Sequence, residues 1–477
     1  MKLINIIKSA DPETEILDII FDTRKAKENT LFICIKGSEF DSHDHAIDAY
    51  NKGCRIFTAE HEVDVPSDAK VFITKDTRRF AAVACAEFFG CPAKKLFVVA
   101  LTGTKGKTSI TFMLRSILEK AGIKTGIIGT TGIIYDDVFI HSDNSTPPPY
   151  IIHYQLSEMV KKGCKAVIIE ATSQGFMQKR TYGMTFDIGV FTNISPDHIG
   201  PNEHKDFNDY FNCKMQIFNQ SKFAVINGNT DHLKEVMDFV RCPYTLYGFE
   251  NRFDTGCESI DFFVEGGEMK TFFVSGGIKY ESGIPGRFSV SNALCAIAVA
   301  KRMSIPIEAI QEGLKNANVR GRMETVYSRN FTVMIDYAHN ELSVAGLFEA
   351  VREYNPKRII TVFGCGGNRS KLRRYDMGEL IAKNSDFFII TSDNPRDEEV
   401  KDINNDILVG VKKAGEKSDY IIIEDRKEAI NFAIKNAIKG DIILVIGKGH
   451  QDYEEIKGKK YPFDERQIIL DAVKTID

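Results

Sequence analysis

The chain has 477 residues, of which 43% are hydrophobic and 27% are charged. This length predicts about three domains, and the apolar fraction excludes a largely disordered chain. The net charge of -4 offers no basic field for nucleic acid or for an anionic membrane surface. No run of about 18 apolar residues is present, so we expect no membrane span. The ten scattered cysteines and the early charges at the N-terminus favour a cytoplasmic protein with reduced thiols.

Residues 1–94 are predicted to form a small α/β domain. Apolar runs over 16–22 and 30–35 predict strands, and helices are expected over 46–53 and 78–90. The turn that contains Thr23 comes at the end of the first strand. A turn with a surface ion pair is the simpler interpretation of this sequence, because nothing else in the region indicates chemistry.

Residues 95–323 begin with an apolar strand, a glycine-rich turn and an amphipathic helix. Gly103 and Gly106 allow backbone N–H groups to face an anion, and the helix start adds its dipole. Lys107 would neutralise the β- and γ-phosphates of a nucleotide, and the Thr108 hydroxyl would hold Mg²⁺. The alternative is a glycine-rich turn with a solvated lysine.

Two further polar side chains follow predicted strands of the same region. Glu170 ends the strand over 167–170, and His198 follows the strand over 187–192. Because ligands of such sheets bind at the carboxyl ends of the strands, we expect Thr108, Glu170 and His198 to converge. Two oxygens and an imidazole suit Mg²⁺ or Mn²⁺ better than zinc. The alternatives are a helix-capping carboxylate and a hydrogen-bonded loop histidine.

Polar and cationic residues also lie on both sides of this strand in the sequence. Prolines follow Ser145 and Thr146 and would hold these two hydroxyls against a rigid ligand, although a plain helix start is equally compatible. Thr172, Gln178 and Arg180 follow the strand closely. They would supply polar and cationic contacts to a second anionic substrate.

A helix predicted over 208–218 places Lys214 on or near its apolar side. A buried lysine is unfavourable as a cation, and a lowered pKa would let the neutral amine react with CO₂. The resulting carbamate would be a carboxylate able to hold a second metal ion. A lysine whose stem packs on the surface, with its ammonium in water, is the commoner case.

Residues 324–477 alternate strands and helices again, after a glycine-hinged basic segment over 319–324. Each predicted strand precedes a polar loop, so we expect a doubly wound, mainly parallel sheet with these loops along one rim. Arg369 and Arg396 in such loops would clamp carboxylates bidentately. Tight strand-to-helix turns are the alternative. The strands are predicted over 332–336, 358–363, 387–391 and 441–446.

Together these motifs resemble those of the Mur ligase family over nearly the whole chain. The resemblance rests on TGTKGKTS, NISPDH, FNCKMQIF, GRMETV and DYAHN, while STPPP, VFGCGGNRS, SDNPRDE and IGKGHQDYE are most similar to one branch of the family. Within that branch, SDNPR matches the signature of members that add meso-2,6-diaminopimelate. It implies an α/β protein of three domains, each with a mainly parallel sheet and flanking helices. These would be a UDP-substrate domain over 1–94, a central ATP-binding domain over 95–323, and a Rossmann-like amino-acid domain over 324–477.

The resemblance also implies an activity. The chain would be an ATP-dependent amide ligase that adds meso-2,6-diaminopimelate to UDP-MurNAc-L-Ala-D-Glu through an acyl phosphate, in the synthesis of peptidoglycan precursors. A monomer that binds neither nucleic acid nor membrane is expected. The same chemistry on L-lysine, on another amine or on another acid is the alternative, and a nucleotide sensor without ligation is a third possibility.

By position, the resemblance implies a set of site residues. Glu170 would share the first Mg²⁺ with Thr108, and His198 with carbamylated Lys214 would hold a second; these three and Lys107 would be the catalytic residues. ATP would meet Gly103, Thr104, Gly106, Lys107, Thr108, Ser109, Asn292, Arg322, Asp336 and His339. The UDP-linked substrate would meet Thr23, Ser145, Thr146, Thr172, Gln178 and Arg180. The incoming amino acid would meet Arg369, Asp393, Asn394, Arg396, Gly447 and Gln451.

Three positions depart from the family's pattern. Lys105 stands where asparagine is usual, and Gln174 stands where a histidine is usual. Gln451 replaces the glutamate that, in diaminopimelate-adding members, receives the ammonium at the far end of the substrate. Losing that charge typically costs about 1–3 kcal/mol, so either diaminopimelate binds less tightly or the acceptor differs.

Overall fold

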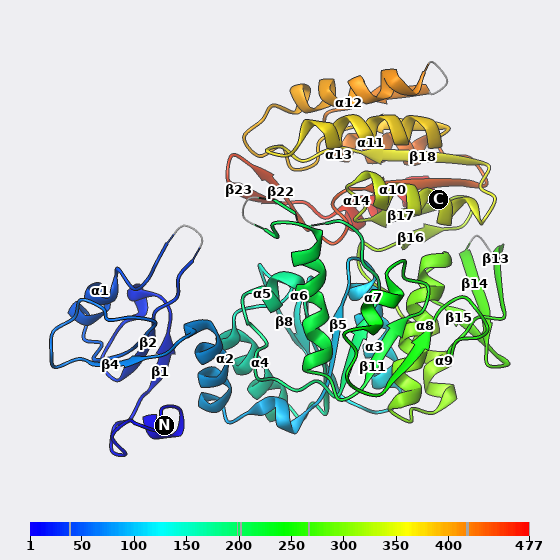
Figure 1. Ribbon diagram of the computed structural model, residues 1–477. Helices are drawn as coiled ribbons and strands as arrows, with labels where there is room; N and C mark the ends of the chain where they lie inside the picture. The colour runs from blue at the N-terminus through cyan, green and yellow to red at the C-terminus, as the bar shows by residue number, and fades with distance from the viewer. Residues whose placement is uncertain (38–39, 198, 201–202, 266–267, 416–418, 477) are drawn as a thin grey trace. The chain divides into compact units, whose positions relative to one another are not determined.

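The computed structural model describes residues 1–37, 40–197, 199–200, 203–265, 268–415 and 419–476. The chain forms two compact units, the first made of Met1–Thr255 with Cys295–Ile310 and the second of Gly256–Leu294 with Gln311–Asp477. It is a mixed α/β protein with mainly parallel sheets, as predicted (Figure 1). The two boundaries between the three domains expected from the sequence stay a prediction.

A four-stranded, all-parallel sheet in the order β1-β2-β3-β4 opens the first unit. Successive residues of its strands point to opposite faces, so Ile19 and Ile20 enter two separate hydrophobic cores. The strands and helices expected here are confirmed. They are the strands β1 Asp18–Ile20 and β2 Thr30–Ile33 and the helices α1 Ala46–Asn51 and α2 Thr77–Phe88. The strands β3 Ile56–Ala59 and β4 Lys70–Ile73 and the 3₁₀ turns η1 Leu3–Asn5, η2 Thr23–Lys25 and η3 Pro92–Lys95 were not predicted.

An eight-stranded sheet follows, in the order β12-β11-β10-β5-β9-β6-β7-β8, of which only β7 and β8 run antiparallel to their neighbours. Strand β5 lies between β10 and β9, so the loop after β5 lies beside the carboxyl ends of both. The strands are β5 Phe97–Thr102, β6 Thr125–Gly129, β7 Gly132–Tyr135, β8 Val138–Ile140, β9 Ala166–Glu170, β10 Ile188–Phe191, β11 Ala224–Asn227 and β12 Tyr244–Tyr247. The helices are α3 Lys107–Lys120, α4 Pro149–Lys161, α5 Ser173–Met177, α6 Phe207–Asn219 and α7 Leu233–Met237.

The chain passes from the first unit to the second after Thr255, returns within α8 Arg287–Arg302, and passes to the second again within α9 Ile307–Lys315. The second unit contains an antiparallel three-stranded sheet and a six-stranded sheet in the order β16-β17-β21-β18-β19-β20, in which only β16 is antiparallel. Its elements are β13 Ser259–Glu265, β14 Glu268–Ser275, β15 Ile278–Ser282, β16 Glu324–Ser328, β17 Thr332–Asp336, β18 Arg358–Phe363, β19 Phe387–Ile390, β20 Asp419–Ile422, β21 Asp441–Ile446, α10 Glu341–Arg352, α11 Lys371–Asn384, α12 Val400–Ala414, α13 Arg426–Lys435 and α14 Glu465–Val473, with a hairpin of β22 Tyr453–Ile456 and β23 Lys459–Pro462.

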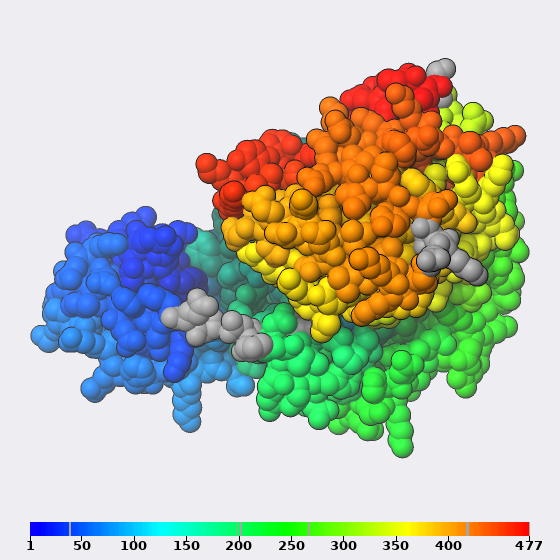
Figure 2. Space-filling view, turned by 90° about the horizontal axis from the view of Figure 1, so that it is seen from above, coloured from blue at the N-terminus to red at the C-terminus, as the bar shows by residue number. Residues whose placement is uncertain are grey.

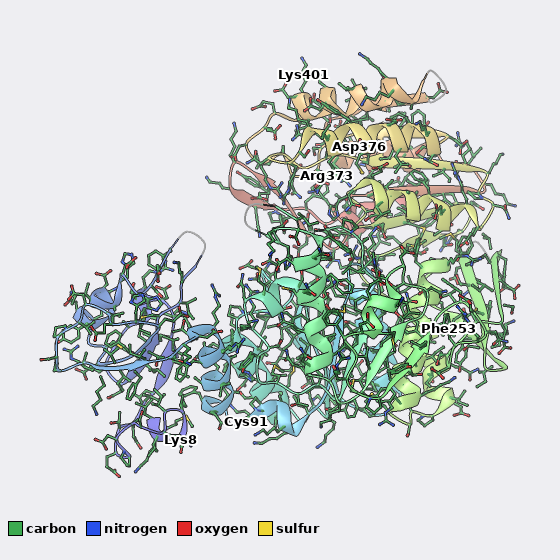
Figure 3. All side chains as sticks on the ribbon, viewed as in Figure 1. Lys8, Cys91, Phe253, Arg373, Asp376 and Lys401 are labelled. Carbon is green, nitrogen blue, oxygen red and sulfur yellow. The ribbon has the colours of Figure 1, made fainter. Side chains whose placement is uncertain are left out.

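Helices cover both faces of the six-stranded sheet and enclose two apolar cores. Helix α12 forms the outer surface of this unit and faces the viewer in Figure 2, in orange. Exposed side chains such as Arg373 and Asp376 project from α11, and Lys401 from α12 (Figure 3).

All ten cysteines of the chain are free thiols. Within the described ranges, no helix combines the length and apolarity needed to cross a bilayer.

Candidate active site

The predicted phosphate loop connects β5 to α3. Gly103 and Gly106 have φ values of +145° and +88°, which side chains with a Cβ rarely adopt. A Cβ on Gly103 would also collide with the Thr192 hydroxyl. Both glycines are therefore required by the backbone, and the loop leads directly into the start of α3 at Lys107.

The segment after β10 holds this loop in place. The Lys105 N–H donates to Asn193 Oδ1 (2.9 Å), and the Thr104 N–H donates to the Asn193 carbonyl (2.9 Å). The Thr104 hydroxyl shares a hydrogen bond of 3.0 Å with Tyr210 Oη on α6. Sequence reasoning missed Asn193 and Tyr210 as site residues, although Asn193 sits at a strand end, where polar residues are informative.

Lys107 and Lys214 both reach the loop. Lys107 Nζ donates to the carbonyls of Gly103 (2.7 Å) and Thr104 (3.1 Å). Lys214, which is 2% exposed, donates to the Gly103 carbonyl (2.9 Å) and lies 4.5 Å from the centre of the Tyr210 ring. Burial, and then the charge of Lys107, place the pKa of Lys214 well below its usual value. The surface alternative for Lys214 is therefore wrong.

Glu170 ends β9 and is 1% exposed. Its Oε1 accepts from the Thr108 hydroxyl (3.0 Å) and the Thr130 N–H (3.2 Å), and its Oε2 accepts from the Thr130 hydroxyl (2.9 Å). These three donors compensate the burial of the carboxylate. The predicted convergence of Thr108 and Glu170 is confirmed, whereas the helix-capping alternative is wrong, because Thr172 caps α5 through the Gly175 N–H.

Thr130 was not predicted from the sequence. It follows β6, whose carboxyl end lies beside that of β9. This place at the sheet edge is the signal that would have found it, once the strand order was known. His198, the predicted imidazole ligand, lies outside the described residues.

Three of the residues predicted for the UDP-linked substrate, Ser145, Thr146 and Thr172, lie around Glu170. The Ser145 hydroxyl shares a 2.8 Å hydrogen bond with the Thr130 hydroxyl, and the Thr146 hydroxyl donates to the Glu170 carbonyl (2.7 Å). Thr146 also shares a 2.9 Å bond with the Thr172 hydroxyl. The structure therefore brings these hydroxyls into one polar network.

Arg180 extends this network. Its Nη1 donates to the Thr146 carbonyl (2.5 Å), and its Nη2 donates to Gln178 Oε1 (2.8 Å). Burial, followed by the charge of Arg78, lowers the pKa of Arg180. A cation held in such a desolvated position is suited to an anionic ligand.

Thr23 belongs to a different part of the first unit, in η2. The neighbouring Asp22 and Arg24 form an ion pair of 2.6 Å, and the hydrogen bonds from Arg24 lower the pKa of Asp22 to about 2. The ion-paired surface turn considered for this stretch is therefore present, and the Thr23 backbone carbonyl accepts from Lys52 Nζ (3.2 Å).

Four of the residues predicted to meet ATP belong to the second unit. Three of these four lie around Tyr337. The Arg322 guanidinium lies 4.7 Å from the centre of the Tyr337 ring, and His339 Nδ1 lies 2.8 Å from the Tyr337 carbonyl. Asp336 accepts from the N–H groups of Met323 and Ala338, both at 2.7 Å. Burial raises the pKa of Asp336. Asn292 lies apart from them in sequence, on α8.

The loops after β19 and β21 meet at a buried asparagine. Asn394 Nδ2 donates to Asp393 Oδ1 (2.9 Å) and to Gln451 Oε1 (2.9 Å). Its Oδ1 accepts from Lys448 Nζ (3.2 Å) and from the Glu455 N–H (2.9 Å). The predicted residues Asp393, Asn394 and Gln451 therefore form one cluster, to which the fully buried Lys448 adds an unpredicted cation.

Arg396 and Arg369 differ in their surroundings. Arg396 has a φ of +52°, and its guanidinium donates to Glu455 Oε2 (3.0 Å) and to the Gly367 carbonyl (2.6 Å). Arg369 is exposed on the loop after β18.

Gly447 is packed so closely on Asp393 that a Cβ on Gly447 would meet the Asp393 carboxylate. The four strand-end loops thus carry the predicted residues along one edge of the six-stranded sheet.

Two family models match the chain, and full-length relatives are known. The family model described as the Mur ligase middle domain matches residues 101–300, and the one described as the Mur ligase, glutamate ligase domain matches residues 321–449. The chain is 34% identical over 470 residues to the UDP-N-acetylmuramoyl-L-alanyl-D-glutamate--2,6-diaminopimelate ligase of Clostridium perfringens, covering 97% of this chain and 96% of that protein. It is 36% identical to the ligase of the same name from Caldanaerobacter subterraneus, covering 99% of each.

Solved structures show the same fold. A UDP-N-acetylmuramoyl-L-alanyl-D-glutamate--2,6-diaminopimelate ligase superposes with a TM-score of 0.74 at 25% identity, over 100% of this chain and 99% of that one. The MurF ligase of Thermotoga maritima, solved in complex with ADP, superposes with a TM-score of 0.63 at 16% identity, over 97% of each chain.

Proposed function

This chain belongs to the Mur ligase family, and we propose that it is an ATP-dependent amide ligase. It adds meso-2,6-diaminopimelate to UDP-MurNAc-L-Ala-D-Glu during the synthesis of peptidoglycan precursors in the cytoplasm, as a monomer. The observation that carries the proposal is one bonded cluster, in which Lys107 and Lys214 share the Gly103 carbonyl and Thr108 meets Glu170. The name shared by the full-length relatives supports the choice of substrates.

The chemistry begins with a poor electrophile. A carboxylate cannot be attacked directly because its leaving group would be oxide. An oxygen of the substrate carboxylate therefore attacks the γ-phosphorus of ATP, the bond to ADP breaks, and an acyl phosphate forms. The amine of the amino acid then attacks the acyl carbon, loses a proton and expels inorganic phosphate. Positioning and charge neutralisation supply most of the acceleration.

The residues of the first unit fit these needs. Lys107 would exchange the Gly103 and Thr104 carbonyls for the phosphates, and the loop with Gly103, Thr104, Gly106 and Ser109 would surround them. The Thr108 hydroxyl and the Glu170 carboxylate, 3.0 Å apart, are the hard oxygen donors that Mg²⁺ prefers. Bound Mg²⁺ would neutralise charge on the phosphates.

Lys214 fits a second metal position. Its burial beside Lys107 favours the neutral amine. A neutral amine reacts with CO₂ to give a carbamate, which would serve with His198 as an oxygen and nitrogen ligand pair. The polar network of Ser145, Thr146, Thr172, Gln178 and Arg180, together with Thr23, would bind the UDP-linked acid.

The remaining predicted residues would bind ATP and the incoming amino acid. Asn292, Arg322, Asp336 and His339 would meet ATP. The incoming amino acid would be held by its carboxylates on Arg369 and Arg396 and by its other polar groups on Asp393, Asn394, Gly447 and Gln451.

A phosphate-release assay with UDP-MurNAc-L-Ala-D-Glu, ATP and Mg²⁺ tests the proposal. The acceptors to compare are meso-2,6-diaminopimelate, L-lysine and L-ornithine, and the product mass identifies the one added. We expect turnover that depends on diaminopimelate. A preference for lysine or ornithine would overturn the acceptor, and no turnover with any amine would overturn the acid substrate.

A further inference from the structure

Arg426 is one of the two bulkiest side chains that the described chain buries completely, with 1% exposure. It begins α13, where its positive charge lies at the unfavourable end of the helix dipole. Burying a guanidinium requires that nearly all of its N–H groups find acceptors. Its position therefore calls for an explanation in terms of what it binds.

The acceptors of Arg426 lie directly behind the amino-acid loops. Its Nη1 donates to the Ser392 carbonyl (2.9 Å), and its Nη2 donates to the Ile446 carbonyl (2.8 Å). These residues immediately precede Asp393 and Gly447, which we assign to the amino-acid site. Its Nε donates to Glu465 Oε1 (2.6 Å), a carboxylate that is 2% exposed at the start of α14.

Strand order explains why such a link is needed. Strands β19 and β21 do not pair with each other, because β18 lies between them. Backbone hydrogen bonding within the sheet therefore does not set the separation of the two loops beyond their ends. One planar guanidinium joins both carbonyls at a fixed spacing, and the contacts of Asn394 with Lys448 and Gln451 add a second link between the same two loops.

We propose that Arg426 is a positioning residue, which sets the spacing of the Asp393–Asn394 and Gly447–Gln451 loops and thereby the affinity for the incoming amino acid. Because its side chain is fully buried, it would act through these loops rather than on the substrate itself. The inference rests on the proposed function, because it concerns the amino-acid site of that reaction. Lysine at this position keeps the charge but has a single nitrogen, which cannot reproduce the planar fork.

The test compares Arg426→Lys with the double variant Arg426→Met/Glu465→Met, which removes the buried pair together and so leaves no uncompensated charge. Lys427→Met, the exposed neighbour on the same helix, is the matched control. We expect both Arg426 variants to raise the KM for the amino acid at least about tenfold, with kcat and the KM for ATP changed by less than about threefold. Thermal unfolding confirms that the variants are folded.

Two outcomes would overturn the inference: a folded double variant with the wild-type KM for the amino acid, or equal increases in the KM values for ATP and for the amino acid. Absence of turnover by the wild-type enzyme would reject the proposed function alone. In that case amide hydrogen exchange decides the positioning role. Faster exchange confined to residues 392–396 and 446–451 in Arg426→Lys supports it, and unchanged exchange there overturns it.

Discussion

Lys107 and Lys214 donate to the same carbonyl oxygen, that of Gly103, at 2.7 and 2.9 Å. Two ammonium groups so close repel each other, and the more buried one pays the larger desolvation penalty. This explains why the pKa of Lys214 lies well below its usual value. Carbamylation would turn the repulsion into an attraction, because Lys214 would then carry a negative charge beside Lys107.

Lys214→Ala should lower kcat by about a hundredfold or more, because the charged group beside the phosphates is lost. Acetate or propionate should restore part of the activity by occupying the space of the carbamate. Lys222→Ala is the control, since its side chain is 65% exposed. Undiminished activity of Lys214→Ala without added acid would contradict the carbamate role.

Glu170→Gln should raise the Mg²⁺ concentration for half-maximal activity by about tenfold or more. The change removes the negative charge and turns an NH₂ group toward donors, since Thr108 and Thr130 both donate to this carboxylate. A magnesium titration of the phosphate-release rate measures the effect. Glu13→Gln, at an 83% exposed side chain, should leave the titration unchanged. An unshifted titration of Glu170→Gln would remove this residue from the metal site.

Gln451→Glu tests the departure from the family's pattern. Asn394 has its amide orientation fixed by Lys448 and by the Glu455 N–H, so its NH₂ group faces the side-chain oxygen of Gln451. A glutamate would keep that bond with one oxygen and present a charged second oxygen. The KM for diaminopimelate should fall by about tenfold if its far ammonium binds here. An unchanged or higher KM would show that the ammonium lies elsewhere.

His153 predicts a pH dependence of stability. It is 1% exposed on α4, and burial lowers its pKa from 6.5 to about 4. Between these values the unfolded chain takes up a proton that the folded chain does not, so the free energy of unfolding falls as the pH falls. From about pH 7.5 to about pH 5 the loss should be about 2 kcal/mol.

Urea unfolding of wild type and His153→Gln at both pH values measures this difference. The variant should lose about 2 kcal/mol less than the wild type on acidification. His141→Gln is the control, because His141 has a 66% exposed side chain. Equal losses for wild type and His153→Gln would exclude this histidine as the cause.

Local sequence patterns were sufficient to predict most helices and strands and part of the candidate site. The apolar strand, the two glycines and the amphipathic helix around Lys107 specify a strand–turn–helix whatever surrounds them, because backbone freedom and side-chain periodicity act over a few residues. The meeting of Thr108 and Glu170 followed from the same reasoning, since adjacent parallel strands bring their carboxyl ends to one edge.

Only the tertiary structure decided which segments far apart in the chain are in contact. Asn193, Thr130 and Arg426 are ordinary residues in the sequence, and their roles depend on which strands are neighbours. The burial of Lys214 likewise depends on the packing of α6 against the phosphate loop. Strand order and burial arise from the packing of whole elements around shared cores, and no short stretch of sequence carries that information.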